Sequence, residues 1–155
     1  MIATVITLNQ NMPEDTFMLQ SQNDDSRRYA VFEDDDTSAW LYLTSPDERK
    51  HVADVWIHNR VPAPPGSDIK NYYGGPPPAA IGFADDAAIC VAPEAHEWSF
   101  LWLDNGNMVV LHCDGRPVAM LNASDKRGWS RNLLRDGPWG KLWDEQLHAR
   151  CTGIA

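Results

Sequence analysis

Two turn signals close together near the middle of the chain constrain the fold more than any other feature. Asn105-Gly106 and Asp114-Gly115 lie within the segment Trp98–Asn122, and each is flanked by apolar residues rich in Val, Leu and Trp. Both dipeptides suit two-residue type I′ turns, which join antiparallel strands. The segment is therefore predicted to form three antiparallel strands arranged as a meander.

The predicted meander is apolar on both faces. An antiparallel sheet with one wet face alternates cleanly between apolar and polar residues, and this one does not. Other parts of the chain must therefore cover both sides. The first face carries Trp98, Phe100, Trp102, Val109, Leu111, Cys113, Val118 and Met120, and the second carries Leu101, Leu103, Met108, Val110, His112, Pro117, Ala119 and Leu121.

The N-terminal half offers strands that can cover one of these faces. They are rich in β-branched and aromatic residues and are separated by turn signals. A C-terminal helix over residues 139–150 is predicted for the other face, because Trp139, Trp143 and Leu147 recur at helical spacing before Gly153. The predicted strands are Met1–Leu8, Thr16–Gln20, Tyr29–Glu33, Ala39–Thr44 and Val52–Asn59.

These elements predict an α+β, mainly β fold in a single domain, residues 1–155. We expect a curled antiparallel sheet, closed as a sandwich or a half-barrel, with the C-terminal helix packed on it. Val61–Pro78 contains six prolines and three glycines and is predicted to be a long loop. Tyr72 and Tyr73 near its tip are candidate contact residues, although a plain insertion would look the same.

The charge is strongly negative and unevenly placed. The formal net charge is −9, and residues 1–48 hold ten acidic side chains against two basic ones. This balance argues against nucleic-acid binding, which needs clustered Lys and Arg. No apolar run is long enough to cross a membrane, and the start lacks a secretory signal. The chain has three widely spaced cysteines, Cys90, Cys113 and Cys151, with no C-x-x-C pair. This pattern is typical of a reducing compartment, so the cytoplasm is expected.

No pattern of residues predicts a catalytic, cofactor or metal site. The run Glu33-Asp34-Asp35-Asp36 could hold a divalent cation, but it lacks the spacing of a calcium loop, so we interpret it as a solvated partner-contact patch. His112 and Cys113 are neighbours on a strand and face opposite sides, which prevents a dyad. Cys113 is predicted to be a small core residue.

Several segments taken together resemble a family of small uncharacterised bacterial proteins, a domain of unknown function. The family has a V-F-E-D-D-G turn before an aromatic strand and a later N-G-x-P-x-A hairpin; here Asp36 replaces the glycine and Asp114 the asparagine. The resemblance spans Tyr29–Asn132. It implies a bacterial, cytosolic, β-rich domain and supplies no catalytic residues. The segments that carry it are 31–37, 40–42, 55–59, 114–119 and 127–129.

The leading hypothesis is a non-enzymatic protein-binding module that neutralises a basic partner such as a toxin, in the manner of an immunity protein. The acidic N-terminal third would steer a cationic partner. The predicted contacts are Glu33, Asp34, Asp35, Asp36, Tyr72 and Tyr73. The first alternative is a small enzyme or ligand-binding protein with an aromatic pocket in the curled sheet, near His58, His96 or His112. A homodimer that buries aromatic surface is the second.

Overall fold

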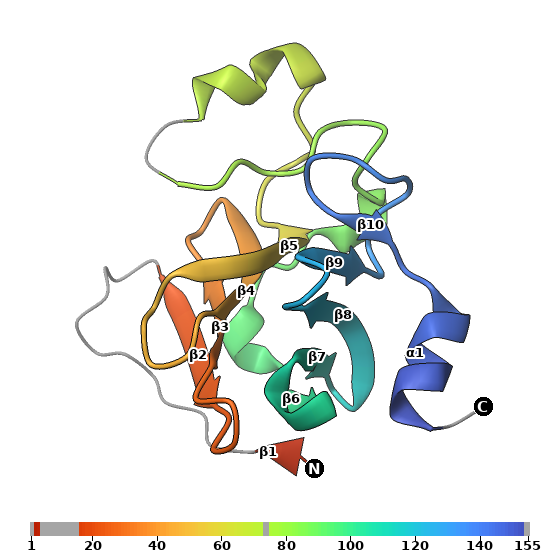
Figure 1. The fold of residues 1–155 in the computed structure, drawn as a ribbon. Coiled ribbons are helices and arrows are strands. Elements are labelled where there is room, and N and C mark those ends of the chain that lie inside the picture. Colours follow the sequence, from red (N-terminus) through yellow and green to blue (C-terminus); the bar gives the residue numbers. More distant parts are fainter. Residues whose placement is uncertain (1, 4–15, 73–74, 154–155) are drawn as a thin grey trace.

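Two stacked β-sheets make up most of the molecule (Figure 1). The computed structural model describes residues 2–3, 16–72 and 75–153. Of the predicted strand Met1–Leu8, only β1 (Ile2–Ala3) is described, and the rest lies outside the described residues. No helix in the described part of the chain has the length and apolarity needed to cross a membrane.

The four-stranded sheet is built from the N-terminal half and corresponds to the last four of the five strands predicted there. Its neighbours all pair antiparallel, and the observed bounds differ from the predicted ones by at most two residues. The sequence periodicity therefore located these elements correctly. In spatial order the strands are β2 (Phe17–Gln22), β3 (Tyr29–Asp34), β4 (Ser38–Thr44) and β5 (His51–Asn59).

The six-stranded sheet contains the predicted meander at its centre. Its pairs are antiparallel except for the last, in which β10 runs parallel to β9. In spatial order its strands are β1, β6 (Trp98–Leu103), β7 (Met108–Cys113), β8 (Arg116–Asn122), β9 (Arg127–Ser130) and β10 (Lys141–Leu142).

The main core lies between the two sheets. Alternation along each strand sends one set of side chains inward: Phe32 and Leu41 point to this core, while Val31 and Trp40 point to the opposite face. The prediction that N-terminal strands cover one face of the meander is confirmed. Over the described residues the fold is a mainly β sandwich, without a closed barrel. The inward side chains include Leu19, Phe32, Leu41, Leu43, Val55, Ile57, Trp98, Phe100, Trp102, Val109, Leu111 and Leu121.

The outer face of the four-stranded sheet is also buried, beneath chain segments that were predicted as loop or helix. Trp40 and the fully buried Trp56 pack there against Ala79, Ala80 and residues further along the chain. Between β5 and β6 the described chain contains only three short 3₁₀ helices, η1 (Gly66–Asn71), η2 (Asp86–Ala88) and η3 (Pro93–Ala95). This connection therefore serves as a cover for the sheet.

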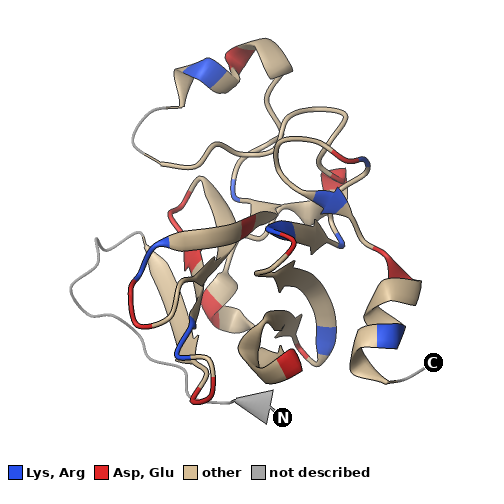
Figure 2. Cartoon of the chain, in the orientation of Figure 1, with Lys and Arg blue, Asp and Glu red and all other residues tan. Residues whose placement is uncertain are grey.

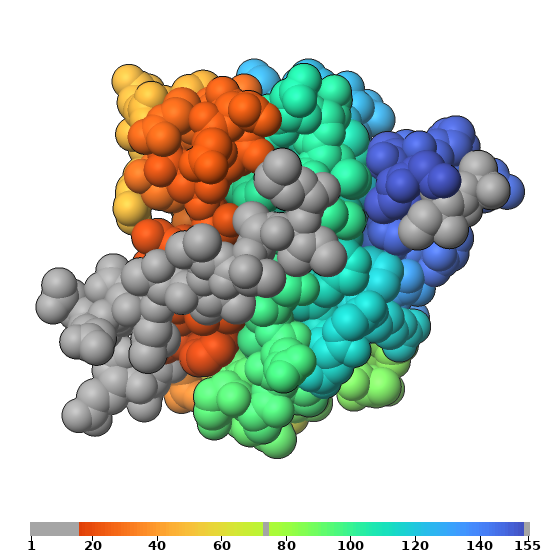
Figure 3. All heavy atoms as spheres, turned by 90° about the horizontal axis from the view of Figure 1, so that it is seen from below, coloured from red at the N-terminus to blue at the C-terminus, as the bar shows by residue number. Residues whose placement is uncertain are grey.

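The outer face of the six-stranded sheet is covered by helix α1 (Glu145–Thr152), as Figure 3 shows in blue beside the teal strands. The predicted helical start at residue 139 is wrong. The carboxylate of Asp144 accepts a hydrogen bond from the amide of Leu147 and caps a helix that begins only there. Trp139 instead joins the cluster over the four-stranded sheet. The helix ends at Thr152, two residues beyond the predicted end at 150, and Gly153 follows it with a left-handed φ of 75°, as expected for a terminating glycine.

The predicted face assignment along β8 is also wrong. Leu111 pairs with Ala119 but His112 pairs with Pro117, so Val118 is an extra residue, a β-bulge. The bulge reverses the alternation: Ala119 and Leu121 point to the main core, and Met120 to the outer cluster under α1. Turn signals alone do not report such an insertion.

One of the two predicted turns has the expected form. Asp114 and Gly115 both have positive φ, 51° and 81°, as a type I′ turn requires, so this prediction is confirmed. The other turn is longer than predicted. Leu103 pairs with Met108, which leaves a four-residue loop around Asn105 and Gly106.

Two histidines lie where α1 covers β7. The pKa of His112 is lowered from its usual 6.5, first by burial and then by the nearby His148. The pKa of His148 is also lowered, mainly by burial; Arg131 lowers it further and Glu145 raises it. Folding therefore favours the neutral form of both imidazoles.

We expect the free energy of unfolding to fall as the pH decreases below about 6.5, because the unfolded chain then binds protons that the folded histidines resist. This stabilising contribution is fully present above the pKa of the unfolded chain. It is lost as the pH falls from that value through the lowered pKa values of the folded protein. Urea midpoints at about pH 7.5 and about pH 5 measure it. His112→Gln should flatten the dependence relative to the parent, and an unchanged slope would contradict this assignment.

Candidate functional site

The candidate site lies at one end of the sandwich, which we call the pocket end. Four segments meet there: the β3–β4 turn, the end of β5, the start of β6 and the β7–β8 turn. A cavity of about 470 Å³ opens at this end. Its lining includes His58, His96, Trp98, Cys90, Cys113, Arg116 and the wall Ala87–Ala92.

A buried charged network lies beneath this cavity. The Asp34 carboxylate is fully buried and lies 2.8 Å from His58 Nε2 and 2.8 Å from Arg60 Nη1. Arg60 also contacts Asp36 at 3.2 Å and donates to the carbonyl of Val91 at 3.2 Å. The network therefore ties the β3–β4 turn and the end of β5 to the cavity wall.

The four carboxylates that were predicted to meet a partner have different roles. Asp34 faces inward and is used by the network. Asp35 Oδ1 accepts hydrogen bonds from the amides of Thr37 and Ser38 and so shapes the turn. Burial and the charge of Asp35 raise the pKa of the half-buried Glu33. Only Asp36 is well exposed, so a partner contact by this run stays a prediction that rests on that residue.

The Pro-rich segment comes close to the same turn. A β-carbon on Gly75 would lie 2.6 Å from Asp35 Oδ2, and the hydroxyl of Ser38 donates to the carbonyl of Pro76. Tyr72 is exposed, and Tyr73 lies outside the described residues. The structure thus places the end of the Pro-rich segment, at Gly75 and Pro76, against the acidic turn.

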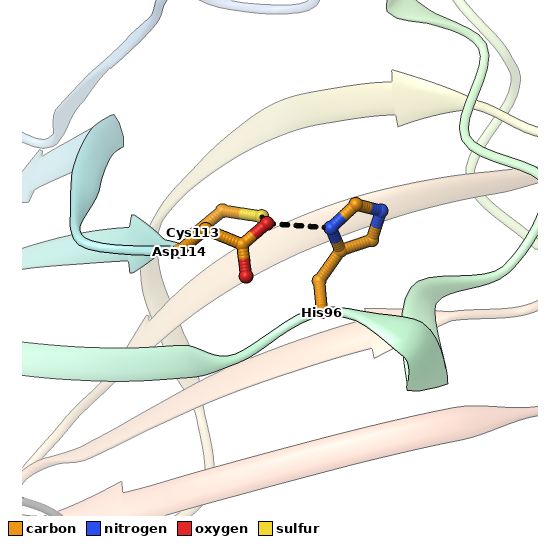
Figure 4. A group of neighbouring side chains, drawn as sticks. All are labelled: His96, Cys113 and Asp114. Carbon is orange, nitrogen blue, oxygen red and sulfur yellow. Dashed lines mark hydrogen bonds and ion pairs between the residues drawn. The ribbon is translucent and has the colours of Figure 1, made fainter.

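A second polar group, which sequence reasoning did not predict, lies at the mouth of the cavity (Figure 4). Asp114 Oδ2 lies 2.7 Å from His96 Nδ1 and 4.0 Å from Cys113 Sγ. The other oxygen of Asp114 accepts a hydrogen bond from the amide of Glu97 at 2.9 Å. The prediction of Cys113 as a core residue is correct only in part, because the residue packs against the core edge and also lines the cavity.

The thiols at the cavity are not activated as nucleophiles. Burial, with the neighbouring Asp114, raises the pKa of Cys113 to about 11. Burial also raises the pKa of Cys90. Catalytic cysteines have lowered pKa values, so this arrangement does not favour nucleophilic catalysis. His112 points away from the cavity, toward α1.

Carboxylates and aliphatic side chains surround the opening. Among the described carboxylates only Glu33, Asp34 and Asp54 belong to strands, and the others lie in turns, loops and short 3₁₀ helices or, for Glu145, at the start of α1 (Figure 2). At the pocket end the exposed acids include Asp36, Asp86, Glu94, Glu97 and Asp114. Ile89 and Val91 in the cavity wall are also exposed, to 40% and 78%. Arg116 is the exposed basic residue in the lining.

The sequence contained a usable signal for the missed group. The predicted Asn105-Gly106 turn, continued along the β6–β7 hairpin, pairs Cys113 with Trp98 and so places residues 96–97 beside the Asp114-Gly115 turn. This signal is the register of the hairpin, and it identifies the group only once the ends of the strands are known.

Comparisons of the chain with protein-family models, curated protein sequences and solved structures find no match. The family resemblance carried by Tyr29–Asn132 therefore stays a prediction.

Proposed function

We propose that this protein is a binding module that receives a basic segment of a partner protein at the pocket end of the sandwich. The observation that carries the proposal is the combination of a hollow, an aliphatic wall and a surrounding set of carboxylates. Lys and Arg side chains have apolar stems and cationic ends, which match an aliphatic hollow rimmed by carboxylates. Covering the basic surface of a partner in this way would inhibit that partner if its activity depends on the surface.

Several contacts support the choice of this end. Arg60 joins Asp36 to Val91, and Glu94 lies close enough to Cys90 to raise its pKa, so both exposed acids border the cavity. The aromatic-pocket alternative has weaker support. Apart from the histidines, Trp98 is the aromatic side chain in the lining, and it is only 6% exposed.

Neutralising the exposed acids at the pocket end should weaken binding of a basic peptide. With hexa-arginine as the probe, the double variant Asp36→Asn/Glu94→Gln should bind roughly three- to tenfold more weakly at low salt, because each exposed charge contributes modestly. Titrations followed by amide chemical shifts measure the affinity and locate the site. The shifts should concentrate at residues 89–91, 96–98 and 114–116.

A matched control removes the same charge elsewhere. Asp24 and Asp25 are exposed in the β2–β3 turn, at the opposite end of the sandwich. Asp24→Asn/Asp25→Asn should leave the affinity within about twofold of the parent, since long-range effects of exposed charges are screened. If both double variants weakened binding equally, or if the shifts spread over both ends, the peptide would be attracted by the overall negative charge. The proposed site at the pocket end would then be wrong.

A further inference from the structure

We propose that His96, Cys113 and Asp114 form a binding site for a divalent transition-metal ion of the zinc type. Their three ligand atoms, an imidazole nitrogen, a thiol sulfur and a carboxylate oxygen, all lie within 4.8 Å of one another. Figure 4 shows the side chains of the β7–β8 turn and of the segment before β6 converging on one point. This inference is independent of the proposed partner binding.

The spacing fits a small tetrahedral ion after a minor adjustment. Metal–ligand bonds of zinc place neighbouring tetrahedral ligands about 3.2–3.8 Å apart. The carboxylate oxygen of Asp114 is 2.7 Å from the His96 nitrogen and 4.0 Å from the Cys113 sulfur. Opening the shorter contact by about 0.5 Å and closing the longer one by about 0.4 Å would bring both pairs to the spacing of zinc ligands. The His96 nitrogen and the Cys113 sulfur lie within 4.8 Å of each other and would also move closer together. His96 and Asp114 are both exposed, so their side chains have room for this change.

The backbone holds the carboxylate ready for a ligand. The amide of Asp114 donates to the carbonyl of Glu97 at 2.7 Å, and the amide of Glu97 donates to Asp114 Oδ1 at 2.9 Å. This pair of bonds fixes the turn against the segment before β6 and leaves Oδ2 directed at His96 and Cys113. Ligating carboxylates in metal sites are commonly oriented by such bonds.

The donor set selects the kind of ion. A thiolate and an imidazole favour zinc and similar transition metals over magnesium or calcium, which prefer oxygen ligands only. On binding, the thiol of Cys113 would lose its proton to solvent. Three protein ligands leave a fourth position for water, and since His96 and Cys113 both line the cavity, that position would face it.

Cobalt(II) titration of the full-length protein tests the site, because a thiolate ligand gives a charge-transfer band and a tetrahedral site gives intense visible bands. We expect one cobalt ion per chain, displaced by zinc. Cys113→Ser should abolish the charge-transfer band. Asp114→Asn, which suits the same turn, should weaken cobalt affinity at least tenfold.

The matched control is Cys90→Ser. Cys90 lines the same cavity but lies outside the cluster of three ligand atoms, so its variant should keep the full band and affinity. Urea midpoints of the metal-free variants establish that each one folds. An absent charge-transfer band in the parent protein, an undiminished band in Cys113→Ser, or its loss in Cys90→Ser would each overturn the assignment. The Asp36 and Glu94 variants leave these ligands intact, so the two proposals fail separately.

Discussion

Asp34→Asn should lower the free energy of unfolding by about 3–5 kcal/mol, the range observed when one partner of a buried ion pair is removed. The side chain keeps its shape but loses the charge that compensates Arg60, whose guanidinium is 16% exposed. His58 loses its anionic partner at the same time. Urea denaturation followed by circular dichroism measures the change.

Asp36→Asn is the control, since it removes an equal charge two residues away. The Asp36 side chain is 54% exposed and contacts the same Arg60. An exposed ion pair contributes about 0–1 kcal/mol, so this variant should remain close to the parent. Similar losses in the two variants would mean that the buried position of Asp34 has no special energetic weight.

Trp56→Ala should lower the free energy of unfolding by about 3–5 kcal/mol, because it removes a large, fully buried side chain. The indole lies between the four-stranded sheet and its cover. Its N–H also donates to Asn59 Oδ1 at 2.8 Å, and Asn59 in turn exchanges hydrogen bonds with the backbone of Ala79. Thermal or urea unfolding gives the comparison.

Trp56→Phe separates the two contributions. It keeps most of the apolar volume and removes the N–H donor, so a loss of about 1–2 kcal/mol is expected. Equal losses for alanine and phenylalanine would show that the hydrogen bond to Asn59, rather than the packing, holds the cover in place.

The sequence predicted the strands and the stacking of the two sheets better than it predicted the segments that cover their outer faces. Trp98–Asn122 was apolar on both faces, and that pattern was sufficient to predict a layer on each side. The start of the helix was missed because Trp139, Trp143 and Leu147 share helical spacing while packing against different sheets. The capping carboxylate of Asp144 was the better local signal.

The candidate site was harder to predict than the fold, because its parts come from separate turns. Exposure was inferred for Asp34 from a run of acids, but its burial depends on His58 and Arg60, 24 and 26 residues away. The group formed by His96, Cys113 and Asp114 likewise depends on hairpin register. Composition and motif spacing do not contain the pairings of Asp34, whereas the second group follows only when the register of the predicted Asn105-Gly106 hairpin is continued to Trp98.

Gly128 in β9 lies where this strand approaches β5 of the other sheet closely, with no room for a side chain between them. A methyl group there would lie 2.6 Å from Val55 Cβ and 2.7 Å from the carbonyl oxygen of Asp54. A side chain at this position would require the backbone of β5 to move, so we expect any sequence that adopts this fold to keep a glycine here.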